Sequence, residues 1–337
     1  MICSQIDVKF YDDFELTNFN TLKIKSVAKK FFLPDNYGEM ISILKKFESQ
    51  KPIVIGNGSN IHFSSKGVKN PIIYTGRIKS AFCLGDKIVV EAGYKTQALS
   101  KLALEKRLSG FEFLIGIPAS LGGAIYMNAG AHGQTISDHL ISAKVYDISE
   151  HKIKHLEKDE LNFSYRHSIF KEKPYILLSA KFELEKKPKE EIKAKMDENL
   201  IFRKNRQPNL ATPNAGSVFK NPPNCEFSAG ALIDKAGLRG ASVGDCEVWE
   251  KHCNFIWNKG NATSLDYTKL IYKIYQTVKE KFDVELSPEI IYIGKMTKEV
   301  EEIWKILRNL IKIQKSQSFV AGFQTKEKSL CAPEEMS

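Results

Sequence analysis

The order of the expected elements predicts an α+β fold. Several short strands, then one helix over 96–107, lead into a glycine-rich stretch over 110–133. Strands and helices do not alternate regularly along the chain, as they do in a doubly wound sheet. A length of 337 residues is enough for two or three domains and a tail. We expect the parts to be 1–76, 77–187, 188–294 and 295–337.

The first part is expected to continue, after a short leader, with a strand, a helix and a second strand. Residues 22–33 alternate between apolar and polar side chains, which indicates a strand. Asp35 or Asn36 can cap a helix whose apolar residues recur at helical spacing as far as Phe47. A short buried strand over 52–55 then runs directly into the sequence GNGSN.

The GNGSN loop, residues 56–60, is the first candidate ligand-binding segment. A strand that ends in glycines and small polar residues gathers backbone amides into a concavity that suits an anion. The loop does not match the dinucleotide-binding fingerprint of Rossmann folds, because Ile61 stands where the third glycine is required. A plain turn between two strands remains the alternative.

The stretch 110–133 is the second candidate. It holds six glycines and four alanines, too many small residues for a segment that fills a core. Such a cluster is tolerated where the backbone bends sharply or closely approaches a ligand. Pro118, Ala119 and Ser120 precede an apolar run and indicate a helix start, whose free amide groups suit a phosphate.

A short strand over 72–75 is expected to end the first part, and the second part to begin with short strands over 80–84 and 88–92 and the helix over 96–107. Strands over 140–148 and 153–156, a helical turn over 158–161 and a strand over 175–184 follow the glycine-rich stretch. A charged helix within 186–207 then crosses to the third part.

The third part is expected to hold two helices and several strands. A short helix lies within 228–240, and 244–263 reads as strand, turn and strand. Thr263 and Asp266 form a capping-box pattern before a helix with an apolar face. That face comprises Leu270, Ile271, Ile274, Tyr275, Val278 and Phe282.

The chain is expected to end with a strand, a helix and a tail. The strand covers 284–294, and an amphipathic helix follows that packs on its own protein. The apolar residues of this helix are Val300, Ile303, Trp304, Leu307, Leu310 and Ile311. From about residue 316 the chain is expected to be poorly ordered.

Three polar residues outside the glycine segments are candidates for chemistry. Arg166 lies among aromatic residues in FSYRHSIFK, an arrangement that suits a planar anion, although exposed arginines are common. Ser217 follows a glycine but lacks the elbow and the partners of a hydrolase nucleophile, so it is a candidate proton donor instead. Glu289 is either a solvated strand end or a buried acid, and the pattern alone does not decide between them.

Composition narrows the classes of function. The formal charge of +10 favours anionic ligands, but the basic residues are spread along the chain, which argues against a nucleic-acid partner. The six cysteines and seven histidines form no metal-ligand pattern, so reduced thiols and packing histidines are expected. No signal peptide or run of about 18 apolar residues occurs, which predicts a cytoplasmic protein without membrane insertion.

Eight stretches together resemble the UDP-N-acetylenolpyruvoylglucosamine reductases of peptidoglycan synthesis. They follow the order of that family over residues 20–294: NTLKIKS, VIGNGSN, GFEFLIGIPASLGGAIYMNAGAHG, YRHSIF, RQPNLATPNAGSVFKNP, AGALIDKAGLRG, KHCNFIWNKGNAT and LSPEI. The resemblance implies two FAD-binding subdomains of the vanillyl-alcohol-oxidase type, 1–76 and 77–187, followed by a substrate-binding α/β domain. It also implies a role in cell wall biogenesis, and hence in cell shape and division.

The resemblance implies a flavoenzyme in which NADPH reduces FAD and UDP-N-acetylglucosamine-enolpyruvate then takes its place. Flavin N5 delivers hydride, Arg166 and a protonated Glu289 stabilise the charge on the substrate carboxylate, and Ser217 gives its proton to the carbanion. Tyr165, Lys220 and Asn221 would contact the substrate. The implied FAD contacts are Ile55, Gly56, Asn57, Gly58, Ser59, Asn60, Ile117, Pro118, Ala119, Ser120, Gly122, Gly123, Asn128, Gly130 and Gly133.

The chain also departs from the family pattern. Arg166 and Ser217 are only 51 positions apart, which resembles the branch that lacks an extra tyrosine loop over the substrate. Ala119 and Ser120 stand where many members have Gly and Thr, and the chain continues from about Met296 past the usual end of the family. Two other classes stay open: an FAD-dependent oxidase with another substrate, and a non-catalytic binding protein. A monomer is expected, although the sequence does not determine the oligomeric state.

Overall fold

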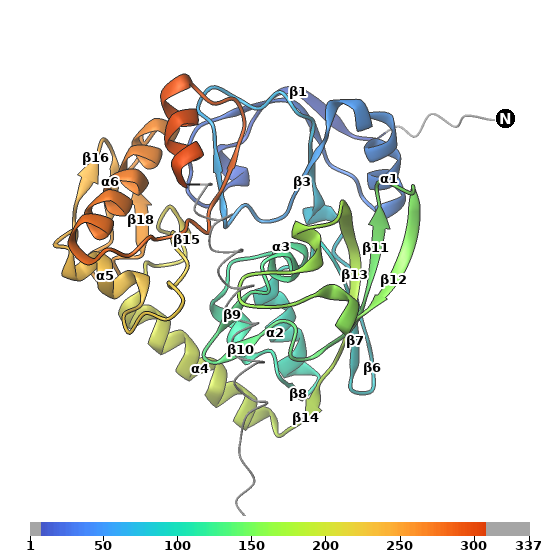
Figure 1. The fold of residues 1–337 in the computed structure, drawn as a ribbon. Coiled ribbons are helices and arrows are strands. Elements are labelled where there is room, and N and C mark those ends of the chain that lie inside the picture. Colours follow the sequence, from blue (N-terminus) through green and yellow to red (C-terminus); the bar gives the residue numbers. More distant parts are fainter. Residues whose placement is uncertain (1–7, 308–337) are drawn as a thin grey trace, which may run out of the picture.

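Three β-sheets of four or five strands, one in each predicted part of the chain, form the framework of the protein (Figure 1). The structure is a computed structural model, and it describes residues 8–307. The first part lies at the top of the view in Figure 1, the second at the lower right, and the third at the left. The mixture of mainly antiparallel sheets and separate helices confirms the predicted α+β class.

The first part is built on a four-stranded sheet in the order β1-β2-β5-β3. Its strands are β1 (Phe10–Glu15), β2 (Val27–Phe32), β5 (Ile72–Tyr74) and β3 (Ile53–Ile55). Strand β1 was not predicted from the sequence, where these residues were assigned to a leader. It pairs antiparallel with β2, and the Phe14 ring stacks on the Phe31 ring with centroids 4.3 Å apart.

Helix α1 (Tyr37–Lys46) confirms the predicted helix of the first part. The Asn36 side chain accepts a hydrogen bond from the Glu39 amide at 3.0 Å, which satisfies a free N–H of the first turn. The helix buries Met40 and Leu44 in a cluster that also contains Tyr146 of the second part. The first and second parts therefore share a core beneath α1.

The second part is an antiparallel five-stranded sheet covered on one face by two helices. Its strands, in sheet order, are β12 (Lys152–Glu157), β11 (Leu140–Asp147), β13 (Tyr175–Glu183), β7 (Lys87–Glu91) and β6 (Ala81–Leu84). Helices α2 (Thr96–Glu105) and α3 (Leu121–Tyr126) bury Leu99, Leu121 and Ile125 against it. The predicted strands and both helix starts are confirmed.

Short elements surround this sheet. They are β8 (Leu108–Ser109) with β14 (Glu185–Lys186), β9 (Gly130–Ala131) with β10 (Gln134–Thr135), and the 3-10 helices η4 (Glu112–Gly116), η5 (Lys158–Leu161) and η6 (Ile169–Lys171). The glycine-rich stretch over 110–133 thus contains η4, α3 and the first strand of a small hairpin.

Helix α4 (Lys189–Arg206) runs from the second part to the third, as predicted (Figure 1). The third part has the sheet order β15-β18-β17-β16, formed by β15 (Asn214–Ser217), β18 (Phe255–Asn258), β17 (Cys246–Val248) and β16 (Ser242–Val243). Helices α5 (Ala229–Lys235) and α6 (Ser264–Phe282) pack on it.

Helix α6 begins with the predicted capping box. The Thr263 hydroxyl accepts from the Asp266 amide, and the Asp266 carboxylate accepts from the Thr263 amide, so two free donors are satisfied. The predicted inner face is buried as far as Val278. Phe282 is an exception, because it lies at the exposed last turn.

The strand predicted over 284–294 is wrong in extent. Only β19 (Ile291–Ile293) forms, and it pairs parallel with β4 (Ile61–Phe63) of the first part. The Ile291 amide also donates to the Asn60 carbonyl at 3.1 Å. The chain therefore returns from the third part onto the strand that follows the GNGSN loop.

A final helix over 298–307 packs on the third part, as predicted. It buries Val300, Ile303, Trp304 and Leu307 in the same cluster as α6. The predicted contributions of Leu310 and Ile311, and the tail from about 316, lie outside the described residues. Within residues 8–307, no helix is both long enough and apolar enough to span a membrane.

Candidate active site

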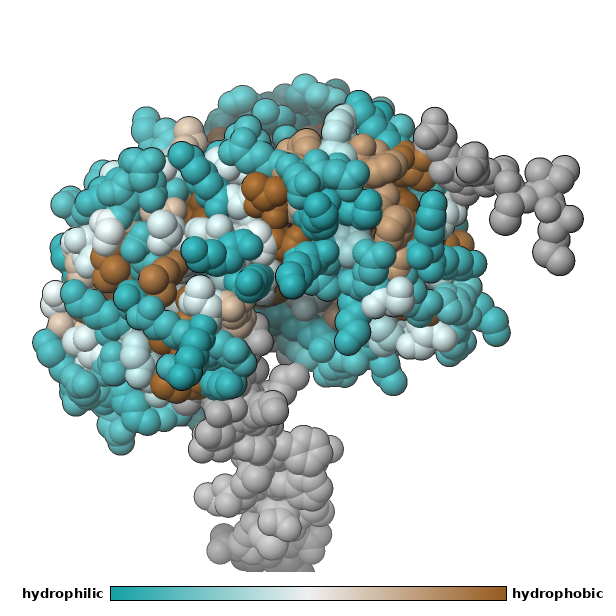
Figure 2. Space-filling model, turned by 90° about the horizontal axis from the view of Figure 1, so that it is seen from above, coloured by the Kyte–Doolittle hydropathy of each residue, from teal (hydrophilic) through white to brown (hydrophobic). Residues whose placement is uncertain are grey.

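A cavity of about 760 Å³ lies where the three parts meet. Both glycine segments line it, together with Arg166, Ser217 and Glu289. Most of the surface seen in Figure 2 is hydrophilic, interrupted by small hydrophobic groups. The volume is within the range of pockets that hold a small molecule or a cofactor, about 300–1,000 Å³.

The two glycine segments touch each other at the cavity wall. A Cβ atom on Gly56 would stand 1.8 Å from the Ser120 hydroxyl oxygen, so only glycine fits there. The Asn57 side-chain amide donates to the Pro118 carbonyl at 2.6 Å, and the Ser120 hydroxyl accepts from the Gly123 amide at 3.3 Å. These contacts hold the two loops as one surface.

Most of the predicted cofactor residues line the cavity. They are Ile55, Gly56, Asn57, Gly58, Ser59, Asn60, Ile117, Pro118, Ala119, Ser120, Gly122, Gly123 and Gly130. Asn128 and Gly133 are not among the lining residues. Asn128 donates to the Ser164 carbonyl at 3.1 Å, and Gly133 lies at the tip of the β9–β10 hairpin with a φ of +78°. The predicted contacts of these two residues with a cofactor stay predictions.

Arg166 lies at the tip of a tight turn. Ser164 and His167 exchange backbone hydrogen bonds in both directions, at 3.3 and 3.1 Å, and Tyr165 and Arg166 form the centre of the turn. Arg166 has a φ of +55°, a left-handed conformation that is uncommon for a residue with a side chain. Strained backbone of this kind is often found at functional sites.

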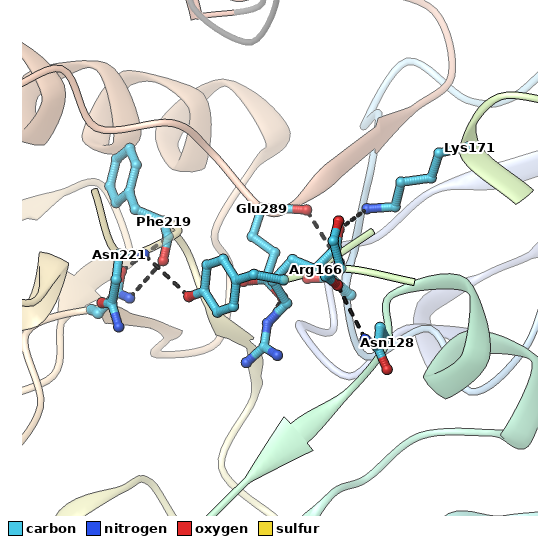
Figure 3. Close-up of polar contacts among 10 residues, drawn as sticks. Asn128, Arg166, Lys171, Phe219, Asn221 and Glu289 are labelled. Atoms are coloured by element: carbon cyan, nitrogen blue, oxygen red, sulfur yellow. Dashed lines mark hydrogen bonds and ion pairs between the residues drawn. The ribbon is translucent and has the colours of Figure 1, made fainter. Parts of the chain in front are cut away.

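Glu289 lies opposite Arg166 (Figure 3). The Arg166 Nε atom is 3.0 Å from Glu289 Oε1, and the two side chains are 21% and 11% exposed. Burial raises the pKa of Glu289, while the positive charge of Arg166 and more distant lysines opposes this increase. Because the effect of burial is larger than that of these positive charges, Glu289 is more readily protonated in this site than a glutamate in water.

Ser217 ends strand β15 next to the segment that carries Glu289. The Glu289 amide donates to the Val218 carbonyl at 2.7 Å, so the two segments lie side by side. Gly216 has a φ of +79°, and a Cβ atom added to it would lie 3.7 Å from the Ser59 carbonyl oxygen of the GNGSN loop. The Ser217 hydroxyl makes no hydrogen bond to another described residue, which leaves it available to a ligand in the cavity.

The three predicted substrate residues do not line the cavity. The Tyr165 hydroxyl accepts from the Asn221 amide at 3.3 Å, and the Asn221 side chain accepts from the Ala229 amide at 3.0 Å (Figure 3). The Lys220 amide donates to the Ser287 carbonyl at 2.9 Å. Tyr165 and Asn221 thus connect the second and third parts. Contacts of these residues with a substrate stay predictions.

Comparison with known proteins decides the family. Residues 207–293 match the C-terminal domain of UDP-N-acetylenolpyruvoylglucosamine reductase, and residues 28–157 match an FAD binding domain. The reductase of Caldanaerobacter subterraneus subsp. tengcongensis is 41% identical over 288 residues, which are 85% of this chain and 94% of the relative. This chain belongs to the UDP-N-acetylenolpyruvoylglucosamine reductase family.

Two further reductases extend the agreement. The reductase of Agathobacter rectalis is 43% identical over 300 residues, covering 84% of this chain and 93% of the relative. The crystal structure of the Thermus caldophilus reductase has a TM-score of 0.71 at 31% identity, covering 85% of this chain and 98% of that one. Family and structure confirm the predicted α+β fold class, with an FAD-binding fold followed by the C-terminal domain of the reductase. The domain boundaries stay a prediction.

The sequence analysis missed two charged residues of the reductase cavity, Lys173 and Arg203. Arg203, on α4, lines the cavity with Gln207, to which its Nη1 atom donates. Burial lowers the pKa of Arg203, its Nε atom has no partner, and no carboxylate among the described residues pairs with it. A buried cation of this kind fits an anionic ligand. The only available signal was its place in RKNRQ, immediately before a family motif.

The residues present therefore fit an FAD molecule. Two apposed glycine loops allow close approach of a large planar group, and Arg203 supplies an uncompensated positive charge. Among residues 8–307, no three His, Cys, Asp or Glu side chains are grouped so that they could hold a metal ion. The four described cysteines, Cys83, Cys225, Cys246 and Cys253, are free thiols.

Proposed function

We propose that this enzyme reduces the enolpyruvyl group of UDP-N-acetylglucosamine-enolpyruvate to UDP-N-acetylmuramate, with NADPH as the reductant and FAD as the cofactor. This reaction supplies a peptidoglycan precursor. The observation that carries the proposal is the convergence of Arg166, Glu289 and Ser217 on one glycine-lined cavity, although they come from distant segments of the chain. When bound, FAD supplies the two-electron chemistry that connects NADPH to the enol ether.

Arg166 binds the carboxylate of the enolpyruvyl group. Its guanidinium can form two parallel hydrogen bonds with a carboxylate, and its Nε atom already contacts a carboxylate oxygen of Glu289. Negative charge that develops next to the reduced carbon spreads onto the substrate carboxylate. A fixed guanidinium therefore stabilises the transition state more than the ground state.

Glu289 acts in its protonated form. A neutral carboxylic acid can donate a hydrogen bond to the substrate carboxylate, whereas an ionised Glu289 would repel it and would compete with it for Arg166. The raised pKa that follows from burial supports this role. The proposed role predicts that activity falls as pH rises through the pKa of Glu289.

Ser217 supplies the proton that completes the reduction. Its hydroxyl is free of protein partners among the described residues and faces the same cavity as Arg166 and Glu289. An alcohol is a weak acid, but a carbanion is a strong base, so the transfer is favourable. A positioned donor of this kind contributes about 10²–10⁴-fold to the rate.

Stopped-flow measurement of the two half-reactions tests this function. In Ser217→Ala, NADPH should still reduce the flavin, whereas oxidation of the reduced flavin by the enol ether should be about 10²–10⁴-fold slower. Ser287→Ala is the matched control, since its buried hydroxyl has no hydrogen-bond partner in residues 8–307. Equal losses in both half-reactions would contradict the proton-donor role. A wild-type enzyme that ignores the UDP-sugar and reduces oxygen instead would favour an oxidase.

Family membership also leads us to place the enzyme in the cytoplasm. We also propose that the enzyme is a monomer. Sedimentation of the FAD-loaded protein at several concentrations tests this, because a monomer of 38.2 kDa would show the same sedimentation coefficient at every concentration.

A further inference from the structure

We propose that Lys171 is a positioning residue for this reaction: its ammonium group holds the main chain of Arg166, and so directs the guanidinium towards the substrate carboxylate. The inference rests on the function proposed above. Lys171 is the last residue of η6, five positions beyond Arg166. Neither the sequence motifs nor the proposed chemistry assigns it a role.

The contact is made to the strained residue itself. The Lys171 Nζ atom donates to the Arg166 carbonyl at 2.8 Å, and Arg166 has a φ of +55° (Figure 3). The Asn128 side chain donates to the Ser164 carbonyl at the start of the same turn, at 3.1 Å. Figure 3 shows Lys171 and Asn128 approaching the turn from two sides. An uncommon backbone conformation persists only where surrounding contacts hold it, and these are two such contacts.

Lys171 is itself fixed to a wall of the cavity. Its Nζ atom lies over the Tyr126 ring, 5.2 Å from the centroid, and Tyr126 lines the cavity from the end of α3. The Ser168 hydroxyl donates to the Tyr126 carbonyl at 2.8 Å. A long lysine side chain is normally flexible, but Lys171 is held by two contacts: the cation–π contact with Tyr126 and the charge-assisted hydrogen bond to the Arg166 carbonyl. Lys171 thus couples the position of Arg166 to α3.

Lys171 also acts on Glu289 through its charge. Positive groups from three segments lower the pKa of Glu289: Arg166 in the turn, Lys171 in η6 and Lys220 after β15. Neutralising Lys171 would therefore raise the pKa of this acid. Because the protonated acid is the active form, activity would then persist to higher pH.

A solvated lysine without a role in the reaction would behave differently from a positioning residue. The variants Lys171→Met and Lys171→Arg separate these cases, because arginine keeps the charge and the donor while methionine keeps only the length. Lys281→Met is the matched control: Lys281 also donates from Nζ to a backbone carbonyl at 2.8 Å, that of Ala236, but it lies on α6 and does not line the cavity.

The experiment compares both half-reactions of the FAD-loaded enzymes over a range of pH. In Lys171→Met we expect flavin reduction by NADPH to stay within about twofold, while reoxidation by the enol ether slows about 10- to 100-fold, the usual effect of a misplaced catalytic group. The alkaline limb of the reoxidation rate should move to higher pH. Lys171→Arg should recover most of the rate, and Lys281→Met should match the wild type.

Other outcomes would overturn the inference. Equal slowing of both half-reactions in Lys171→Met, or a rate equal to that of the wild type, would each mean that Lys171 does not position Arg166. An unmoved alkaline limb would contradict the effect of its charge on Glu289. If Lys171→Met fails to retain FAD, a Lys171→Arg variant that folds but remains slow would also contradict the inference. Failure of the proposed function is distinguishable, because the wild-type enzyme itself would then not be reoxidised by the enol ether.

Discussion

Replacing Arg166 with Met should raise the pKa of Glu289 further, because the variant removes the nearest positive charge. The Arg166 Nε atom is 3.0 Å from Glu289 Oε1. At this distance an effective dielectric constant of about 20 gives a direct attraction of about 5.5 kcal/mol. An attraction of this kind favours the ionised acid and so lowers its pKa. We therefore expect the pKa of Glu289 to rise in this variant, because burial then acts without the opposing charge.

Infrared difference spectra recorded against pH would measure this change directly. The carbonyl band of the protonated acid can be assigned by its absence in Glu289→Gln, and its titration compared between the wild type and Arg166→Met. Arg206→Met is the control, because that guanidinium stacks on Phe202, 4.3 Å from the ring centroid, and does not line the cavity. An unchanged titration of Glu289 in Arg166→Met would refute the claim that this ion pair opposes the effect of burial.

Two further predictions concern the cofactor loops and stability. Gly56→Ala should greatly reduce the flavin that co-purifies with the protein, since the new Cβ would meet the Ser120 hydroxyl. Gly85→Ala is the control: it strains the backbone at a φ of +64° but meets no atom within 4 Å, so it should retain the flavin. Equal flavin content in both would count against the apposed loops. Burial lowers the pKa of His62 from 6.5 to about 3, so the unfolded state binds more protons below pH 6.5 and stability falls as pH falls towards 3. Measured by urea unfolding, the free energy of unfolding should fall by about 2 kcal/mol between pH 7 and pH 5 because of this group. This fall should be absent in His62→Phe and should remain when the exposed His155 is changed to Gln. The same fall in His62→Phe as in the wild type would contradict the prediction.

Local patterns in the sequence predicted much of the fold because their causes are local. The capping box at Thr263 and Asp266 and the cap at Asn36 depend on residues three or four positions apart, and both formed as expected. The apposition of the two glycine segments is compatible with their composition but follows from no local rule. It becomes visible only in three dimensions, where a Cβ atom added to Gly56 would stand 1.8 Å from the Ser120 hydroxyl oxygen.

Non-local features escaped the sequence analysis for physical reasons. Strands β4 and β19 have three residues each and pair across more than 200 positions, so no local pattern indicates that they pair. Arg203 belongs to a helix whose sequence is mostly charged and whose buried residues are Ile192, Met196 and Asn199, and only the tertiary structure shows that its guanidinium faces the cavity. The position of Glu289, by contrast, was predicted by the family motif, while its burial was not decided by the local pattern.

The final helix helps to explain how Glu289 is held in place. The His62 ring of β4 contacts the rings of Tyr267 on α6 and Tyr292 on β19, with ring centroids 4.8 and 4.9 Å apart. The Trp304 ring of the final helix lies near the same His62 ring, with centroids 6.5 Å apart. The Trp304 Nε1 atom also donates to the Thr268 hydroxyl at 3.3 Å. Glu289 lies two residues before β19, so a helix beyond the residues that the family model matches, 207–293, supports the strand pair next to the acid. Because this aromatic group joins the first part to the third, it stabilises the same arrangement that brings Glu289 to Arg166.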